Sequence, residues 1–424
     1  MFAPTSGRRA RSRLSEKPHS LDPAARAPRR KARLRLVHPA ERPAERGGMP
    51  PRIARYLETA ELPSPCLVVD VDLVEYNYLD LARSLPQARI FYAVKANPAE
   101  EIVARLARLG SCFDTASMGE IELCLAHGVT ADRISFGNTI KKQRDIAAAY
   151  ERGVRLFAFD SEAELRKLAA SAPGAKVYCR VLTDGAGAEW PLSRKFGCEA
   201  DMAVELLTLA KTLGLDAYGI SFHVGSQQLD LSQFDRALAA TAEIFRRLAE
   251  RGVTLRMVDM GGGFPSRYRQ DVPGMEAYGR AIGEALQRRF GAVLPEIIVE
   301  PGRGLVGDAG VIQAEVVLVA RKGGADNRRW VYLDIGKFGG LAETMDEAIK
   351  YRFLTTHDGG EAEPVVLAGP TCDSADVLYE KSGYAMPLAL QAGDRVWILA
   401  TGAYTTTYSA VNFNGFPPLA SVCI

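Results

Sequence analysis

Lys95, in the segment AVKAN, is the first residue whose type and position could do chemistry. It follows the apolar run Ile90–Val94. A lysine at the end of a β-strand can form a Schiff base with an aldehyde when burial lowers the pKa of its amine. An isolated lysine is more often a solvated surface residue. The apolar run before Lys95 and the Asn-Pro turn after it leave these two interpretations balanced.

His223 is the one histidine of five that ends a strongly apolar segment, SFHVGSQ. The turn that follows, Gly225-Ser226, offers backbone N–H groups and a hydroxyl to an anion. The alternative is a buried histidine with satisfied hydrogen bonds, and the residues alone leave both open. His127 precedes Gly128 at the end of a helical pattern, so we expect it to cap that helix.

Three consecutive glycines, Gly261, Gly262 and Gly263, follow the next apolar run in DMGGGFP. Glycines let the backbone approach a phosphate closely, although tight turns require them too. The segment is not a dinucleotide-binding or P-loop motif, since it lacks their spacing and the Lys-Ser/Thr pair. The next run ends in Glu300-Pro-Gly-Arg303, whose two charged groups could serve a ring nitrogen and a phosphate, or form a salt bridge.

All these side chains come at the ends of short apolar runs. Between Arg89 and Arg303, eight β-rich runs alternate with amphipathic stretches, which predicts βα units and a parallel sheet. The runs are Ile90–Val94, Cys112–Asp114, Ile134–Phe136, Leu156–Phe159, Val177–Val181, Ile220–His223, Met257–Met260 and Ile297–Glu300. Eight units predict a closed (β/α)8 TIM-like barrel, in which active sites lie at the C-terminal ends of the strands.

One barrel helix is clear from its pattern. Met202, Leu206, Leu209 and Leu213 follow the spacing of a buried stripe, and Gly214 ends the helix.

After Arg303 the pattern changes to β-branched and aromatic runs separated by turns, which predicts a mostly antiparallel β-domain. These runs are Val311–Val319, Trp330–Leu333, Val365–Leu367 and Arg395–Leu399. The earlier run Cys66–Asp70 could join them. We therefore expect a barrel at 72–305 and a β-domain made of 49–71 plus 306–424.

Composition places the chain among ordinary globular proteins. Of its 424 residues 47% are hydrophobic and 25% charged, and no apolar run approaches the ~18 residues that cross a bilayer. Seven cysteines without a CxxC pair argue against disulfides and zinc, and favour a reducing, cytoplasmic location. Residues 1–48 contain 13 Lys/Arg and 4 Asp/Glu. We interpret them as a disordered basic extension, with a nucleic-acid arm or a transit peptide as the alternatives.

Nine stretches together carry a specific resemblance. They are FYAVKAN, CFDTASMGEIE, AFDSEAEL, SRKFG, SFHVGSQ, DMGGGFP, EPGRG, GPTCDSAD and GAYTTTYSAVNFNGF. In this order they resemble the pyridoxal-phosphate decarboxylases with an alanine-racemase-like barrel, and within that group the ornithine decarboxylases. The resemblance covers roughly residues 50–420.

The resemblance implies a cofactor, pyridoxal 5′-phosphate, and assigns residues to it. Lys95 would hold it covalently, Glu300 would pair with its pyridine nitrogen, and His223 would stack on its ring. The residues implied for the phosphate are Ser226, Gly261, Gly262, Gly263, Arg303 and Tyr404. Further pocket residues implied to steady the cofactor are Asp114, Glu120 and Arg180.

The same resemblance assigns the substrate side of the site. Cys372 would return a proton to Cα after CO2 leaves, and Asp373 and Asp346 would bind a distal amine. Glu343 and Glu347 lie close to Asp346 in the sequence, which leaves the choice of acid open.

The implied assembly is an obligate homodimer with shared active sites, in which the loop of Cys372 and Asp373 reaches the neighbouring subunit. A pair formed by Lys195 and Asp376 would bridge the two chains.

The implied reaction is decarboxylation of L-ornithine to putrescine and CO2, for polyamine biosynthesis, with L-lysine to cadaverine as a second possibility. Diaminopimelate decarboxylase, an amino-acid racemase and a non-catalytic regulatory homologue are the alternatives. We expect neither a nucleic-acid nor a membrane partner.

Overall fold

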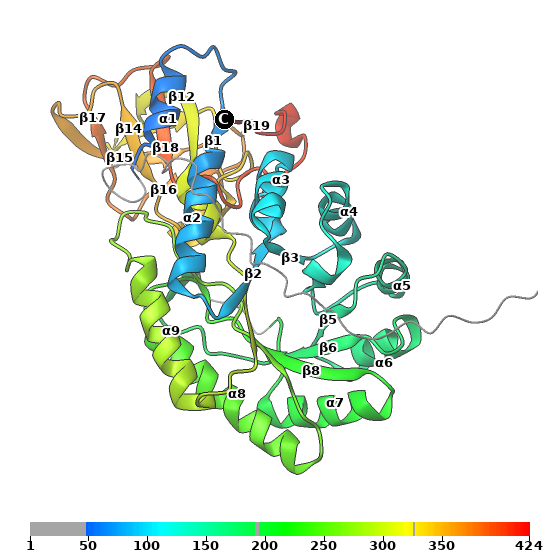
Figure 1. Ribbon diagram of the computed structural model, residues 1–424. Helices are drawn as coiled ribbons and strands as arrows, with labels where there is room; N and C mark the ends of the chain where they lie inside the picture. Colours follow the sequence, from blue (N-terminus) through cyan, green and yellow to red (C-terminus); the bar gives the residue numbers. More distant parts are fainter. Residues whose placement is uncertain (1–47, 191–194, 325–326) are drawn as a thin grey trace, which may run out of the picture. The chain divides into compact units, whose positions relative to one another are not determined.

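Eight parallel strands close into a barrel (Figure 1), in the order β10-β11-β2-β3-β4-β5-β6-β8. They are β2 (Ala88–Ala93), β3 (Cys112–Thr115), β4 (Ile134–Phe136), β5 (Leu156–Phe159), β6 (Lys176–Arg180), β8 (Asp216–Ser221), β10 (Met257–Asp259) and β11 (Glu296–Val299). Each of the eight predicted runs overlaps one of these strands, so the predicted barrel is confirmed. The computed structural model describes residues 48–190, 195–324 and 327–424, which belong to one compact unit. The predicted basic extension, apart from its last residue, lies outside these ranges.

Eight helices accompany the barrel strands in the described ranges. They are α2 (Val71–Ser84), α3 (Glu100–Leu109), α4 (Met118–Ala126), α5 (Gln143–Glu151), α6 (Glu162–Ser171), α7 (Ala200–Thr212), α8 (Ser232–Glu250) and α9 (Met275–Phe290). Asp70, Ser117 and Ser161 cap three of them by accepting hydrogen bonds from free backbone N–H groups of the first turn. His127 is the C-cap of α4, as predicted. No helix in these ranges is both long and apolar enough to cross a membrane.

The buried stripe predicted for α7 was partly wrong. Met202 is 38% exposed, while Ala203, Leu206 and Ala210 are buried. The sequence of α7 has apolar residues on several faces, and the small alanines let the helix lie close to its neighbours. The predicted end of the helix is confirmed, because Gly214, one residue past the C-cap, has a positive φ of 76°.

A nine-stranded sheet forms the second part of the chain. Its main path is β14-β18-β12-β13-β15-β16, with β1 paired to β12, β19 paired to β1, and β17 paired to β15. The strands are β1 (Cys66–Val69), β12 (Gly310–Arg321), β13 (Arg329–Leu333), β14 (Arg352–Thr355), β15 (Ala362–Ala368), β16 (Val377–Tyr379), β17 (Ala385–Pro387), β18 (Arg395–Leu399) and β19 (Ala420–Cys423). All its pairings are antiparallel except β1 with β19 and β13 with β15. The mostly antiparallel β-domain is confirmed, including the early strand that joins it.

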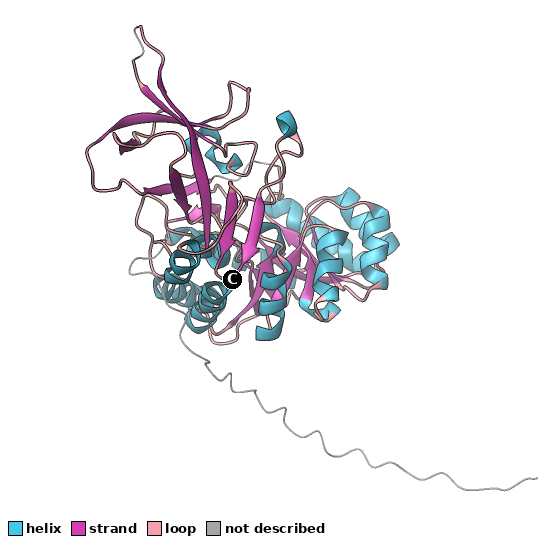
Figure 2. Cartoon of the chain, turned by 90° about the horizontal axis from the view of Figure 1, so that it is seen from above, coloured by secondary structure: helices cyan, strands magenta, loops and turns pink. Residues whose placement is uncertain are grey.

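The remaining elements are short. They are α1 (Pro51–Leu57), α10 (Arg303–Val306), the strand pair β7 (Ala188–Trp190) and β9 (Ser226–Gln228), and the 3-10 turns Val94–Ala96, Ala131–Arg133, Gly307–Ala309, Ala342–Glu347 and Phe413–Gly415. Figure 2 shows the helices gathered around the barrel strands, whereas the β-domain is mostly strands and loops. We propose 72–305 as the barrel domain and 49–71 plus 306–424 as the β-domain.

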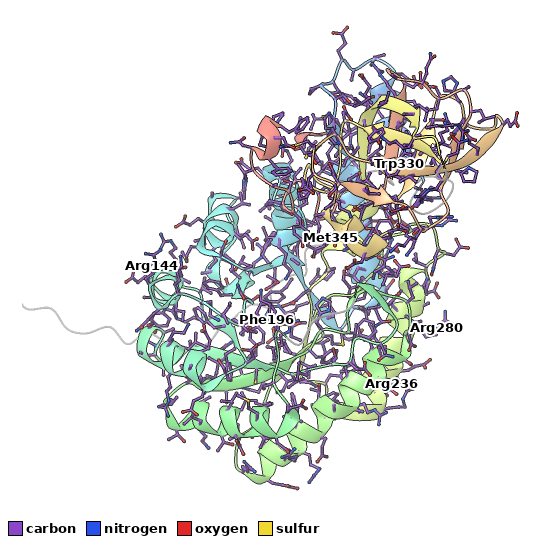
Figure 3. All side chains as sticks on the ribbon, turned by 180° about the vertical axis from the view of Figure 1, so that it is seen from behind. Arg144, Phe196, Arg236, Arg280, Trp330 and Met345 are labelled. Carbon is purple, nitrogen blue, oxygen red and sulfur yellow. The ribbon has the colours of Figure 1, made fainter. Side chains whose placement is uncertain are left out.

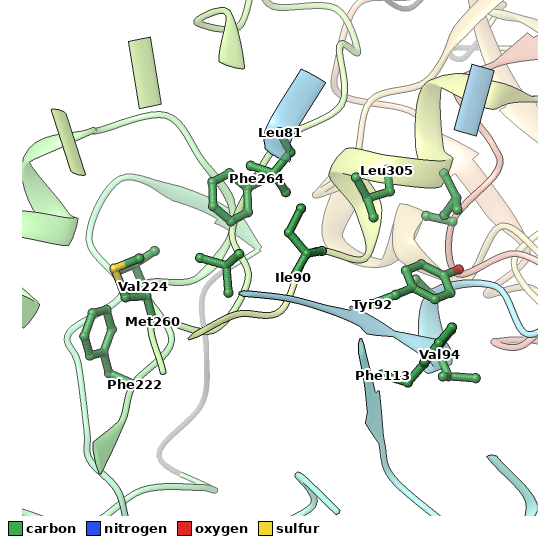
Figure 4. Packing of buried hydrophobic residues seen from close by; sticks show 14 of the residues in the cluster. Leu81, Ile90, Tyr92, Val94, Phe113, Phe222, Val224, Met260, Phe264 and Leu305 are labelled. Carbon is green, nitrogen blue, oxygen red and sulfur yellow. The ribbon is translucent and has the colours of Figure 1, made fainter. Parts of the chain in front are cut away.

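One cluster of buried side chains extends through both parts. It includes Ile90 and Phe113 in the barrel, Leu305 in α10, and Ile312 and Leu333 in the sheet. Figure 4 shows the barrel side of this cluster, where Leu305 lies near Ile90. A shared, close-packed core resists deformation. The strand ends and the loops of the β-domain are therefore held in fixed positions around the site.

Candidate active site

A small cavity opens at the C-terminal ends of β2, β8, β10 and β11. It is lined by Ala93, Lys95, His223, Ser226, Gly262, Gly263, Phe264, Glu300, Gly302, Arg303 and Tyr404. Eight of these eleven residues are ones that the sequence predicted for the cofactor. The fold therefore brings together residues that lie more than 300 positions apart in the chain.

Lys95 lies in the 3-10 turn that directly follows β2, and its Nζ is 3.1 Å from Oδ2 of Asp114. Asp114, at 3% exposed, is buried on the neighbouring strand β3. The Asp114 carboxylate raises the pKa of the Lys95 amine, and this attraction outweighs the opposing effect of burial. Burial does act to lower this pKa, but in the cofactor-free chain the net shift is upward. Lys95 is held as an ammonium group that must lose a proton before it can act as a nucleophile.

Glu120 lies behind this ion pair, in the first turn of α4. Its carboxylate accepts a hydrogen bond of 2.7 Å from the backbone N–H of Ala116. Burial raises the pKa of Glu120, and the nearby Asp114 adds to the rise while Lys95 opposes it. Glu120 thus contributes to the negative potential around Lys95 without lining the cavity.

The imidazole of His223 faces the cavity as a neutral ring. The backbone N–H of Gly225 donates to Nδ1 at 3.0 Å, so the proton of the neutral ring lies on Nε2. Burial lowers the pKa of His223 to about 3, and the cations Arg180 and Lys95 contribute to the lowering. A flat, uncharged ring in this position is suited to stacking on another aromatic ring.

Arg303 also lines this cavity, and several side chains hold its guanidinium in place. Its Nη1 and Nη2 donate to the two carboxylate oxygens of Glu343 at 2.8 and 2.6 Å, and Nη1 also donates to the hydroxyl of Tyr268 at 2.7 Å. Nε and Nη2 are 3.3 Å from the hydroxyl of Ser226, and the guanidinium lies 5.1 Å from the ring centroid of Tyr404. The β-domain therefore fixes the guanidinium through a bidentate ion pair.

The glycine segment requires glycine because other backbone atoms lie too close for a side chain. A Cβ on Gly262 would lie 2.8 Å from the carbonyl oxygen of Glu300 and 3.2 Å from Nε2 of His223. Gly263 has a φ of 100°, and a Cβ there would lie 2.9 Å from the carbonyl oxygen of Gly225. The backbone of this loop is thus exposed to whatever the cavity binds.

We expect the substitution Gly262→Ala to weaken cofactor binding strongly, since an added methyl group in a site this close costs about 1–3 kcal/mol. Titration of purified protein with pyridoxal phosphate, followed by absorbance, measures the change. Gly283→Ala is the matched control, because its Cβ would meet only Gln87 at 3.7 Å in the interior of α9. Equal affinities for the two variants would contradict a role of the Gly262 backbone in binding.

A larger cavity of about 940 Å³ lies beside the first and shares no lining residue with it. It is lined by Arg180, Gly187, Ala188, Glu189, Lys195, Phe196, Leu229, Gln270, Met345, Asp346, Glu347, Ala348 and Lys350. Figure 3 labels Phe196 and Met345 on this face. Arg180 connects the two cavities, because it lies at the end of β6 and is close enough to His223 to influence its pKa.

Three acids of the 343–347 turn have different environments. The carboxylate of Glu343 forms the ion pair with Arg303. The sequence did not predict this pair. Glu347 accepts hydrogen bonds of 2.7 Å from the backbone N–H groups of Glu380 and Lys381, and another from the hydroxyl of Ser382. Asp346 is exposed at the wall of the larger cavity, and no described residue donates a hydrogen bond to it.

Glu189 is a residue of the same cavity that the sequence did not reveal. It lies on β7, and burial raises the pKa of its carboxyl while Lys350 and Arg303 lower it. The strand β7 is only three residues long, so the segment EWPLSRKFG shows no alternating pattern that would have predicted a strand at Glu189.

Cys372 and Asp373 lie on the exposed loop between β15 and β16, and neither lines the two cavities. The backbone N–H of Cys372 donates to Oδ1 of Asn414 at 3.1 Å, and its Sγ lies 3.5 Å from the same oxygen. Within the described part of one chain, Cys372 is thus not gathered with Lys95. Its predicted position in the site of a second subunit stays a prediction.

Asp376 is buried beneath the Cys372 loop. Its carboxylate accepts hydrogen bonds from the backbone N–H of Lys337 at 2.8 Å and from the N–H and hydroxyl of Thr371 at 3.1 and 2.7 Å. Asp376 therefore shapes the loop within its own chain. Its predicted pairing with Lys195 across an interface stays a prediction.

The donor set of the smaller cavity fits a phosphorylated aromatic aldehyde. It combines an amine, a neutral aromatic ring, a half-buried carboxyl group at Glu300, and an arginine with a hydroxyl beside exposed backbone at Gly262. Residues 71–307, more than half of the chain, match the family described as pyridoxal-dependent decarboxylase, pyridoxal binding domain. The chain belongs to this family.

Individual relatives agree with this assignment. The decarboxylase is 38% identical over 357 residues to the lysine/ornithine decarboxylase of Selenomonas ruminantium, covering 84% of this chain and 88% of the relative. Among solved structures it resembles SrLDC in complex with PLP and cadaverine, with a TM-score of 0.80, 34% identity and coverage of 90% and 95%. It also resembles the Paramecium bursaria Chlorella virus arginine decarboxylase bound to agmatine, with a TM-score of 0.80, 29% identity and coverage of 88% and 100%. The protein is a pyridoxal-phosphate-dependent carboxy-lyase for a basic amino acid.

Proposed function

We propose that the decarboxylase converts L-ornithine to putrescine and CO2, with L-lysine as a second substrate. The observation that carries this proposal is the environment of Asp346. Its carboxylate faces the larger cavity, whereas the two neighbouring acids, Glu343 and Glu347, are engaged elsewhere. A carboxylate facing open space beside the cofactor cavity is suited to a charge-assisted hydrogen bond with a distal ammonium group.

Bound pyridoxal phosphate supplies an electron sink for the bond between Cα and the carboxylate. In this proposal Lys95 holds the cofactor, and Asp114 keeps its amine oriented between turnovers. His223 covers one face of the ring and Glu300 holds a proton at the ring nitrogen. The phosphate is bound by Arg303 and the Ser226 hydroxyl together with the glycine backbone and Tyr404.

The remaining roles require a homodimer. We propose that Cys372 of a second subunit gives a proton to Cα after CO2 leaves, and that its Asp373 joins Asp346 at the distal amine. The exposure of this loop and its separation from Lys95 within one chain support the arrangement. A cytoplasmic location and the absence of nucleic-acid partners stay predictions.

The test is CO2 release from ornithine, lysine, arginine and diaminopimelate, each with added cofactor. Release from ornithine above all others supports the proposal, with lysine ranked second. Ornithine and lysine differ by one methylene, worth about 1–3 kcal/mol in a pocket, so their ratio of kcat/KM should stay within about two orders of magnitude. Preference for diaminopimelate would assign the larger cavity to a distal carboxylate, with Lys350 as its partner, and would overturn the proposal.

We expect Asp346→Asn to raise KM for ornithine by about tenfold or more, because a hydrogen bond to a charged group contributes about 1.5–3 kcal/mol. Steady-state kinetics with saturating cofactor measure the effect. Glu361→Gln, an exposed acid of the β-domain that lines neither cavity, is the control. If KM is unchanged in both variants, another acid binds the amine, and Glu189→Gln is the next variant to measure.

A further inference from the structure

Asp259 is a buried acid that the proposed mechanism does not use. It is the last residue of β10, 2% exposed, and its carboxyl group is hydrogen-bonded to that of Glu300, which directly follows β11. An ionised carboxylate can only accept hydrogen bonds. A hydrogen bond between two carboxyl groups therefore requires a proton on one of them.

The backbone fixes the two acids relative to each other through one residue. The N–H of Gly261 donates to Oδ1 of Asp259 at 2.9 Å, and the carbonyl of Gly261 accepts from the N–H of Glu300 at 2.8 Å. Gly261 has a φ of 64°, and a Cβ there would lie 2.5 Å from the carbonyl oxygen of Phe222. The glycine loop thus holds the Asp259 carboxyl group and the backbone of Glu300 in place, so that the two acids lie side by side.

The charges around the pair favour one negative charge over two. Burial is the largest cause that raises the pKa of Asp259, to about 6, and that raises the pKa of Glu300. Asp114 on β3 raises both, whereas Arg180 on β6 lowers that of Asp259 and Lys95 lowers that of Glu300. The other titratable groups that face the pair are Tyr178 on β6 and His223 after β8.

We propose that Asp259 and Glu300 hold a single proton between them in the cofactor-free protein, and that the pair gives up this proton when the cofactor binds, so that Glu300 would meet the protonated ring nitrogen as a carboxylate. Asp259 is then a positioning residue that keeps Glu300 protonated until the cofactor binds. The ring nitrogen of free pyridoxal phosphate already carries a proton at neutral pH, so the proton that leaves the carboxyl oxygen of the pair passes to solvent. The inference rests on the role proposed for Glu300.

Proton counting during cofactor binding tests this idea. Calorimetric titration of the full-length protein with pyridoxal phosphate, in buffers of different ionisation enthalpy at neutral pH, gives the number of protons exchanged. In Asp259→Asn the amide oxygen can still accept from Gly261, while the amide N–H can donate to Glu300, which no longer needs a proton. Wild type should therefore release about one more proton per site on binding than this variant does. Asp201→Asn, an exposed acid at the start of α7, should match wild type.

A second measurement needs neither cofactor binding nor turnover. The infrared spectrum of cofactor-free wild type at neutral pH should contain the C=O band of a protonated carboxyl group. This band should be missing from the spectra of Asp259→Asn and Glu300→Gln, and should therefore appear in the difference spectrum of wild type minus each variant. Equal proton counts, or a wild-type spectrum without the band, overturn the shared proton. Failure of the substrate assays would leave the infrared result intact, so the two proposals can fail separately.

Discussion

Replacing Lys95 by alanine is expected to lower kcat by about three orders of magnitude or more, because groups of one catalytic site act as a unit and the amine has no substitute. Among the described residues that line its cavity, Lys95 is the only lysine. The variant should also lose the absorbance of covalently bound cofactor. CO2 release from ornithine and the absorbance spectrum of the purified protein are the two measurements.

Two variants separate chemistry from structure in this experiment. Lys95→Arg keeps a cation beside Asp114 but cannot condense with an aldehyde, so it should fold and remain inactive. Lys142→Ala removes an exposed lysine after β4 and should retain full activity. Full turnover in Lys95→Ala would refute the assignment of this residue. Inactivity of Lys95→Ala with an active Lys95→Arg would show that only the charge opposite Asp114 is needed.

Mixing Lys95→Ala with Cys372→Ala is expected to restore activity that neither variant has alone. If each site uses Lys95 of one subunit and Cys372 of the other, a heterodimer contains one intact site and one site with both changes. Random exchange of subunits then gives roughly one quarter of wild-type activity, since half of the dimers are mixed and each has one of two sites intact. Activity after dissociation and reassembly of equal amounts measures the recovery.

The control pairs two changes in the barrel. Lys95 and Glu300 line the same cavity of one chain, so every site in a mixture of Lys95→Ala and Glu300→Gln contains a lesion. That mixture should stay inactive. If the mixture containing Cys372→Ala also stays inactive although the dimers exchange, the proton donor for Cα belongs to the same chain as Lys95.

The barrel was predictable because its signals are local. Each strand is a short run of apolar residues followed by a polar or glycine residue, and the order of the runs alone dictates a closed barrel. Lys95, His223 and the glycines then fall at one end, since parallel strands place their C-terminal ends together. The same reasoning holds for most of the cofactor cavity.

The parts of the site that could not be predicted from the sequence are contacts between segments far apart in the chain. The pairing of Arg303 with Glu343 joins the barrel to the β-domain, and nothing near either residue specifies the other. The contact between Asp259 and Glu300 depends on how β10 and β11 lie side by side. Asp346 could be distinguished from its neighbours only after their hydrogen-bond partners were known.

The pairing of β1 with β12 has a consequence for the order of events during synthesis. Cys66 pairs with Gln313, and the sequence of the whole barrel lies between them. The strand β1 is synthesised first, and it must remain unpaired with β12 until the eight βα units that follow it in the sequence have been synthesised. Contacts between such distant positions form late and slowly. We expect the nascent chain to pass through a stage in which the barrel is formed and the strand Cys66–Val69 is still unpaired, open to capture by a chaperone.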